Sequence, residues 1–127
     1  MSTISQNKVL IQRWNSNFIE TKNLQVFHEL VAPSFVNHAA PAGKQGFTDT
    51  LHFFEQVLWP ALAGIRVEIL DQVGEGDKIV THKVLHGILE KDFMGFPATH
   101  AAVAIEVIDI FRIEAGKLAE HWGMVIH

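Results

Sequence analysis

The stretch that decides the fold is Ile108-Asp-Ile-Phe-Arg-Ile-Glu-Ala-Gly-Lys-Leu-Ala-Glu-His-Trp-Gly-Met-Val-Ile-His127. It is typical of two strands joined by a tight turn at Glu114-Ala-Gly-Lys117. In the first strand, Asp109 shares one face with Val107 and Phe111, because side chains alternate between faces. A carboxylate on an apolar strand face is costly to ionise, so Asp109 is a candidate for proton transfer.

The rest of the chain divides into a helical half and a strand-rich half. Apolar residues at helical spacing predict three helices, over residues 5–20, 23–32 and 45–59. Alternating residues predict four antiparallel strands, over residues 66–73, 78–89, 100–113 and 117–126. Helices followed by an antiparallel meander favour an α+β fold with the helices on one face of the sheet.

Length and composition exclude several classes of protein. The 127 residues fit one domain, 1–127, and a net charge of −4 without a basic cluster does not favour a nucleic-acid partner. The absence of cysteine excludes disulfides, thiolate metal sites and a cysteine nucleophile. The first residues are not typical of a signal peptide, and no apolar run is long enough to span a membrane. We therefore expect a cytoplasmic protein without a membrane partner.

The second strand of the hairpin brings an imidazole close to Asp109. A turn centred on residues 115–116 sets Asp109 roughly against His121 or Trp122. If this face lines a pocket, desolvation raises the pKa of Asp109 towards the range of a general base at neutral pH, and the carboxylate orients the imidazole. Structural alternatives remain open: Asp109 is held by a backbone amide or by Arg112 of a neighbouring subunit, or forms only a cross-strand ion pair with His121.

His82 and His86 are four residues apart in a predicted strand. At about 3.3 Å per residue they lie roughly 13 Å apart, too far to share a metal ion whose ligands lie about 2 Å away. No other metal-ligand spacing occurs, so neither a metal nor a cofactor is expected. The two histidines either line a pocket as polar contacts or are packed neutral side chains bonded to the backbone.

Further candidate pocket residues lie at loop edges. Asn37 and His38 precede a Pro- and Gly-containing loop and either face a cavity mouth or cap the next helix. Trp122 is either a pocket wall or part of the core. Phe93 lies in a connection with Gly and Pro, which is either a lid or an ordinary loop.

Five segments, in this order and spacing, resemble the SnoaL-like polyketide cyclase family, also called ester cyclases. They are Phe35-Val-Asn-His38, Gly76-Asp-Lys-Ile-Val80, Phe93-Met-Gly-Phe-Pro-Ala-Thr99, Ile108-Asp-Ile-Phe-Arg-Ile113 and Gly116-Lys-Leu-Ala-Glu-His-Trp122. The likeness covers nearly the whole chain. It implies a cone-shaped α+β barrel of the nuclear transport factor 2 type, with three N-terminal helices on a strongly curved antiparallel sheet around an apolar pocket.

The resemblance also implies a chemistry. Family cyclases close a ring by intramolecular aldol condensation without a cofactor, and a carboxylate is the general base. The matching positions are Asp109, the pair His121-Trp122 and the loop pair Asn37-His38. Two segments depart from the family pattern: His86-Gly-Ile-Leu-Glu-Lys-Asp92 stands where Gly-Thr-His-x-Gly is usual, and His100 replaces a usual glycine. Both departures concern the expected pocket mouth and put a polyketide substrate in question.

The leading hypothesis is a cofactor-independent enzyme that acts on a small, largely apolar carbonyl compound. Asp109 would remove a proton next to the carbonyl, and His121, or else His82 or His86, would donate to the developing enolate oxygen before ring closure or isomerisation. The alternatives are a non-catalytic protein that binds an apolar ligand and a purely oligomeric protein. Apolar residues on both faces of strand 101–113 favour a homodimer in every case.

Overall fold

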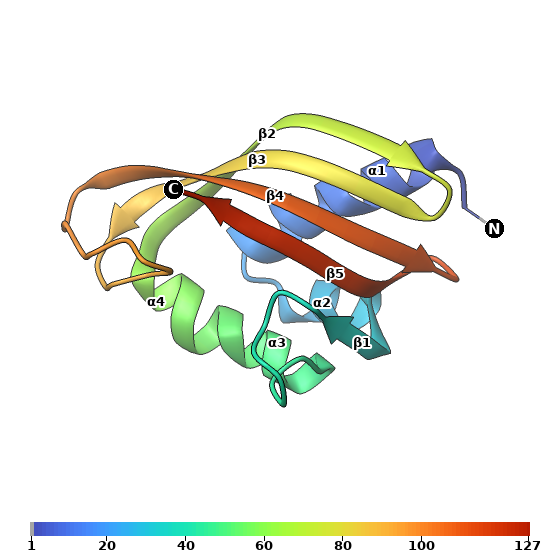
Figure 1. Ribbon diagram of the computed structural model, residues 1–127, viewed down its shortest axis with the longest axis horizontal. Coiled ribbons are helices and arrows are strands. Elements are labelled where there is room, and N and C mark those ends of the chain that lie inside the picture. The colour runs from blue at the N-terminus through green and yellow to red at the C-terminus, as the bar shows by residue number, and fades with distance from the viewer. Residues whose placement is uncertain (1) are drawn as a thin grey trace.

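Helices fill the first half of the chain and long strands fill the second (Figure 1). The structure is a computed structural model that describes residues 2–127. The helical segments are α1 (Ile4–Arg13), η1 (Trp14–Glu20), α2 (Leu24–Leu30), α3 (Phe47–Phe53), η2 (Phe54–Leu58) and α4 (Trp59–Ala61). The strands are β1 (Val31–Asn37), β2 (Leu62–Glu75), β3 (Lys78–Leu89), β4 (Ala102–Glu114) and β5 (Lys117–Ile126). The expected order, three helical regions and then an antiparallel meander, is confirmed.

Local signals explain where the first helices begin and end. The Thr3 hydroxyl accepts a hydrogen bond from the Gln6 N–H, and the Gln6 side chain accepts one from the Thr3 N–H, which forms a capping box for α1. The second helix, α2, ends at Leu30, shortly before Pro33, because proline disfavours a helical conformation in the residue that precedes it. No helix within residues 2–127 is long and apolar enough to cross a membrane.

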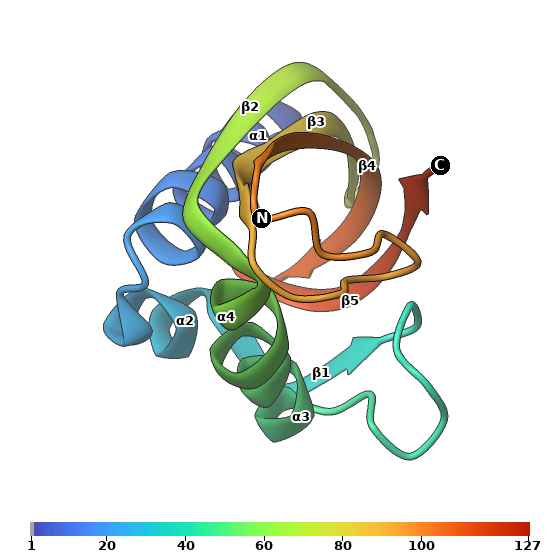
Figure 2. The same cartoon turned by 90° about the vertical axis from the view of Figure 1, so that its left-hand side faces the viewer.

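The five strands form one strongly curved sheet in the order β1-β5-β4-β3-β2. Figure 2 shows β2 to β5 following an arc around the interior, with the helices on one side. The cone-shaped α+β barrel is therefore confirmed. The short strand β1 pairs with β5 in parallel, and this pairing sets Asn37 beside His121.

The hairpin between β4 and β5 contains an irregularity. Ala115 and Gly116 both adopt positive φ angles, 51° and 74°, as the tight turn requires. Three residues after Gly116, the register shifts because Ala119 has no partner on β4, which makes it a bulge. As a result Asp109 pairs with Gly123, and the expected pairing with His121 or Trp122 is wrong by one or two positions.

The core lies between the helices and the concave face of the sheet. Four aromatic rings from the helices pack against one another there: Trp14 stacks on Phe18 with ring centroids 4.7 Å apart, and Phe27 and Phe54 lie 5.1 and 4.9 Å from Phe18. All four side chains are buried. This packing holds η1 against the sheet, next to the polar groups described below.

Candidate active site

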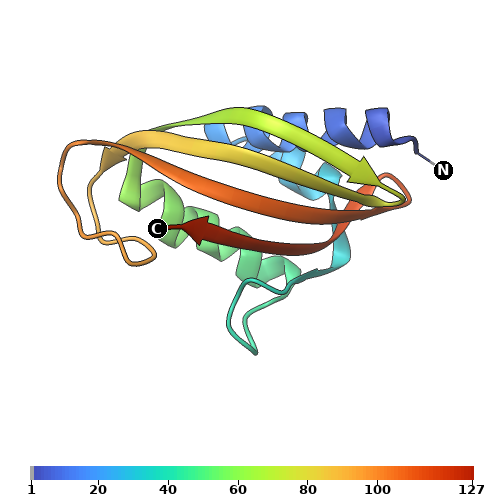
Figure 3. The same ribbon diagram turned by 45° about the horizontal axis from the view of Figure 1, so that its top comes forward.

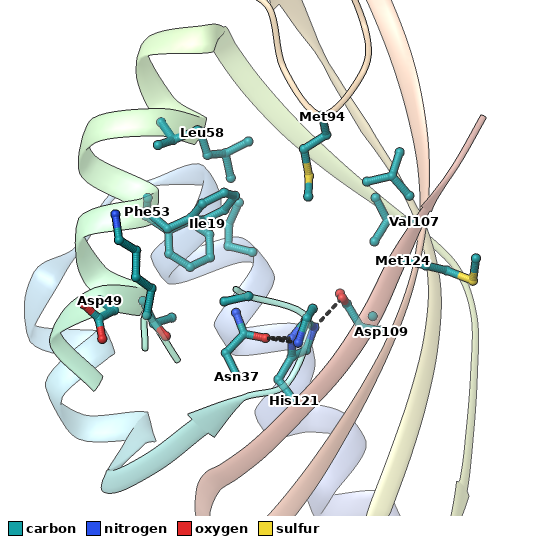
Figure 4. A pocket seen from close by; sticks show the side chains of 18 of the residues that line it. Ile19, Asn37, Asp49, Phe53, Leu58, Met94, Val107, Asp109, His121 and Met124 are labelled. Carbon is teal, nitrogen blue, oxygen red and sulfur yellow. Dashed lines mark hydrogen bonds and ion pairs between the residues drawn. The ribbon is translucent and has the colours of Figure 1, made fainter. Parts of the chain in front are cut away.

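A cavity of about 450 Å³ lies between the helices and the concave face of the sheet (Figure 4). This volume lies within the range of small-molecule sites. Most of the lining is apolar, including Ile19, Phe35, Phe53, Leu58, Phe93 and Val107. The polar side chains of Asn37, Lys83, Asp109 and His121 also line it. The arrangement is that of a ligand pocket with a few convergent polar groups.

Asp109 is buried on the concave face of β4, on the same face as Val107 and Phe111, as its strand pattern predicts. Its two carboxylate oxygens contact different basic side chains. Oδ1 lies 2.7 Å from Nε2 of His121, and Oδ2 lies 2.6 Å from Nζ of Lys83. Within the chain, therefore, Asp109 is held by a lysine and a histidine that share its pocket.

The pKa of Asp109 differs from the expectation. Burial alone would raise the pKa, as the sequence suggested, but the charges and hydrogen bonds of Lys83 and His121 lower it more. The pKa of Asp109 therefore lies well below its ordinary value, and the carboxyl is ionised at neutral pH. The expectation of a raised pKa is wrong, because it considered desolvation without the lysine.

Lys83 and its partner Asn15 are the functional candidates that the sequence analysis missed. The Lys83 ammonium donates to Oδ1 of Asn15 over 2.7 Å, and the Asn15 amide donates to the Ile11 carbonyl over 2.9 Å. Asn15 belongs to η1, which is π-helical, a local form that is frequent at functional sites. A fully buried lysine is rare without such partners. In the sequence, the available signal was that Lys83 lies two residues before Leu85 in β3, and therefore on the same face of the strand.

His121 is held at both ring nitrogens. Nδ1 lies 2.7 Å from Oδ1 of Asn37, and the same oxygen accepts a hydrogen bond from the Ala39 N–H over 3.0 Å. That second bond fixes the Asn37 amide with its oxygen towards His121, so Nδ1 must donate. Nε2 faces the ionised oxygen of Asp109. Since both nitrogens face acceptors, the arrangement is complete when His121 carries both ring protons as a cation.

Gly123 leaves the Asp109–His121 pair uncovered. It lines the cavity and pairs with Asp109 across the strands. A Cβ atom at this position would lie 2.9 Å from Oδ1 of Asp109 and 2.9 Å from Nε2 of His121, closer than real contacts allow. Gly123 has no positive φ angle, so space and not backbone conformation requires glycine. A bound molecule can therefore approach both polar atoms from the cavity.

His82 and His86 do not face the cavity, and the expectation that they line it is wrong. They lie on the outer face of the sheet, where His82 pairs with Glu106 and His86 Nε2 lies 2.9 Å from Glu68 Oε1. The strand alternates as predicted, but its odd-numbered residues point inward, Lys83 among them. The two histidines therefore have acidic partners instead of a ligand.

The remaining predicted residues divide between the two sides of the sheet. His38 and Trp122 are outside the cavity: their rings stack with centroids 4.8 Å apart, and His38 Nε2 lies 2.7 Å from a Glu120 oxygen. The expectation that they contact a ligand in this pocket is therefore wrong. Phe93 is buried against the cavity, with Met94 beside it. Within residues 2–127, no group of three His, Cys, Asp or Glu residues is placed to hold a metal ion.

Comparisons with known proteins agree with this architecture. The family model described as SnoaL-like polyketide cyclase matches residues 9–125. No curated protein matches the chain in sequence. Among solved structures, TsrD from Streptomyces laurentii has 21% identity and a TM-score of 0.83, with 98% of this chain and 91% of that chain covered.

Two further solved structures are similar. IdmH from Streptomyces antibioticus, described as a candidate polyketide cyclase, has 23% identity and a TM-score of 0.78, with 93% of this chain and 90% of that chain covered. A SnoaL-like protein from Jannaschia sp. CCS1 has 22% identity and a TM-score of 0.80, with 98% and 89% covered. At these identities the structural likeness establishes the fold.

Proposed function

Since the chain belongs to the SnoaL-like polyketide cyclase family, we propose that it is a cofactor-independent acid–base enzyme acting on a small, largely apolar carbonyl compound. The observation that carries the proposal is the 2.7 Å contact between Asp109 Oδ1 and His121 Nε2 at an apolar cavity. A carboxylate and an imidazole in direct contact can take up and deliver a proton in turn. The reaction is proton abstraction followed by aldol-type ring closure or isomerisation.

The proposed steps use the chain's own side chains. Asp109 accepts a proton from the carbon next to the substrate carbonyl, and His121 and Lys83 stabilise the negative charge that develops on the carbonyl oxygen. In ring closure, that carbon bonds to a second carbonyl carbon of the same molecule, whose oxygen takes a proton from His121. The proton on Asp109 then passes to His121 along their hydrogen bond. The product is an isomer of the substrate, so no other reactant is consumed.

The low pKa of Asp109 sets a condition on this mechanism. A carboxylate with a depressed pKa is a weak base. Proton transfer to Asp109 is therefore favourable only when Lys83 and His121 stabilise the enolate oxygen more than they stabilise the Asp109 carboxylate. The space beside Gly123 allows a substrate to approach Asp109 and His121 together. The condition is met when the carbonyl oxygen, as it becomes negative, lies close to Lys83 or His121.

The same contacts favour a second candidate, a binding protein without catalysis. Both oxygens of Asp109 are already bonded, which suits a structural carboxylate as well as a base. The distinguishing measurement is exchange of the protons next to the carbonyl of aryl ketones and 1,3-diketones in D₂O, followed by NMR. Wild type should accelerate exchange, and Asp109→Asn should lower it by about 10²-fold or more, with ketone binding retained. Glu106→Gln, on the outer face, is the matched control.

Ketone binding without any acceleration of exchange by wild type would support the binding protein and refute the enzyme. If Asp109→Asn exchanged protons as fast as wild type, Asp109 would not be the base. Glu106→Gln should exchange protons as fast as wild type, since Glu106 contacts His82 outside the cavity. The slower exchange of Asp109→Asn can then be attributed to loss of the pocket carboxylate.

The outer face of the sheet supports a homodimer as a further part of the proposal. The helices lie behind the sheet and leave the other face of β2 to β5 uncovered (Figure 3). Partly or fully exposed apolar side chains gather there, namely Val80, Val84, Ile108, Ile110 and Met124. A second copy that buries at least about 1,000 Å² would cover them. Ile110→Lys should then shift the mass measured by light scattering from dimer to monomer, and a monomeric wild type would refute this.

A further inference from the structure

The charges that line the cavity do not cancel where they are buried. Lys44, Asp49 and His52 lie at the surface end, where they are exposed or half-buried and screened by water. The side chains of Lys83, Asp109 and His121 are only 5%, 8% and 15% exposed. The buried charges therefore determine which ligand the interior prefers.

When His121 carries both ring protons, this buried group has one positive charge in excess. Lys83 is cationic, Asp109 is ionised, and His121 donates from both ring nitrogens. An excess charge in apolar surroundings is costly unless a counter-charge compensates it. Lys83 has three N–H donors, and among residues 2–127 two acceptors contact them, Asp109 and Asn15. One donor of the ammonium is thus left for a ligand.

We propose that the pocket selects an apolar molecule that carries a carboxylate, and that Lys83 is the residue that makes this selection. This deepens the proposed function, on which it rests for the reacting carbonyl, since it names the substrate class of that site as an apolar keto acid. The ligand carboxylate lies against the Lys83 ammonium and completes the neutrality of the cluster. The keto group then lies towards Asp109 and His121, in the space that Gly123 leaves open.

The test compares two ligands of the same shape and apolar area, 2-naphthoate and 2-naphthamide, by calorimetric titration at pH 7. Wild type should bind the carboxylate at least about tenfold more tightly than the amide. Lys83→Met should reduce this ratio to about one, because the remaining Asp109–His121 pair is neutral. Lys83→Arg should retain most of the preference. Asp109→Asn should raise the ratio, because it removes the negative charge.

Two controls keep the result interpretable. Arg13→Met removes a partly exposed cation outside the cavity and should leave the ratio unchanged. Circular dichroism checks that each variant is folded. If Lys83→Met does not fold, the opposite shift expected of Asp109→Asn still tests the proposal.

Equal affinity of wild type for the two ligands would overturn the inference, and so would an unchanged ratio in folded Lys83→Met. The outcome is separable from that of the proposed reaction. Absence of proton exchange with a retained carboxylate preference would refute the reaction alone, whereas exchange without the preference would refute the selection alone.

Discussion

The buried ion pair between Lys83 and Asp109 should couple these two residues strongly in the free energy of unfolding. Their charged atoms are 2.6 Å apart, and both side chains are almost fully buried. With an effective dielectric constant of about 20, the attraction at this distance is about 6 kcal/mol. Desolvation of the two charges cancels a large part, so we expect a coupling energy of about 3 kcal/mol.

The double variant should cost no more than the more damaging of the two single variants. Asp109→Leu leaves the Lys83 ammonium with only the Asn15 oxygen as acceptor, and should cost about 3 to 5 kcal/mol. Lys83→Met should cost about 3 kcal/mol, because His121 still compensates Asp109. The double variant places two apolar side chains against each other, so its cost should be about 3 kcal/mol smaller than the sum of the two.

The assay is urea unfolding at pH 7, followed by tryptophan fluorescence and circular dichroism. A matched control cycle uses Arg13 and Glu29, whose two hydrogen bonds measure 2.9 and 2.7 Å but whose side chains are 39% and 55% exposed. That pair should couple far more weakly than Lys83 and Asp109, because solvent screens its charges. Additive effects of Lys83→Met and Asp109→Leu, within about 0.5 kcal/mol, would refute the reasoning.

Three further outcomes follow from the same site. Because the pKa of Asp109 is lowered on folding, its stabilising contribution is complete above the unfolded value of about 3.9 and is lost as the pH falls below it. The melting temperature of wild type should therefore fall more steeply below about pH 4 than that of Asp109→Asn. Parallel curves of melting temperature against pH would contradict this. Gly123→Ala should abolish ketone binding or proton exchange, because its methyl group would fill the space beside Asp109 and His121. Gly64→Ala, at a positive φ of 63° outside the cavity, should cost about 1 kcal/mol of stability and retain binding. Equal ketone binding by the two variants would contradict the steric argument. Asn37→Leu removes the acceptor of one ring proton of His121, so nitrogen NMR at pH 7 should show two ring N–H groups in wild type and one in the variant, and identical spectra would rule this out.

Much of the fold was accessible from local patterns. Alternating residues located the long strands, and the Gly-containing turn at residues 114–117 located the hairpin. The inward face of Asp109 was also predictable, because its neighbours Val107 and Phe111 are apolar. These features depend on residues close together in the chain, where periodicity is informative.

The parts of the site that were missed depend on contacts between distant segments. In the sequence, nothing distinguishes Lys83 from other charged strand residues, and only its contacts with Asn15 and Asp109, 68 and 26 positions away, explain its burial. The interpretation that places His82 and His86 in the pocket is wrong, since alternation alone does not tell which face of the strand is inward. The pKa of Asp109 was mispredicted for the same reason, because its cause lies on another strand.

The bulge at Ala119 decides which side chains of β5 face the cavity. If β4 and β5 paired residue by residue from the turn, with Ala119 paired like its neighbours, the orientations of His121 and Trp122 would be exchanged. The indole would then face the interior and the imidazole would face solvent. Deleting this one alanine should therefore remove the bulge, leave residues 120–126 in their present register with β4, and keep the imidazole beside Asp109.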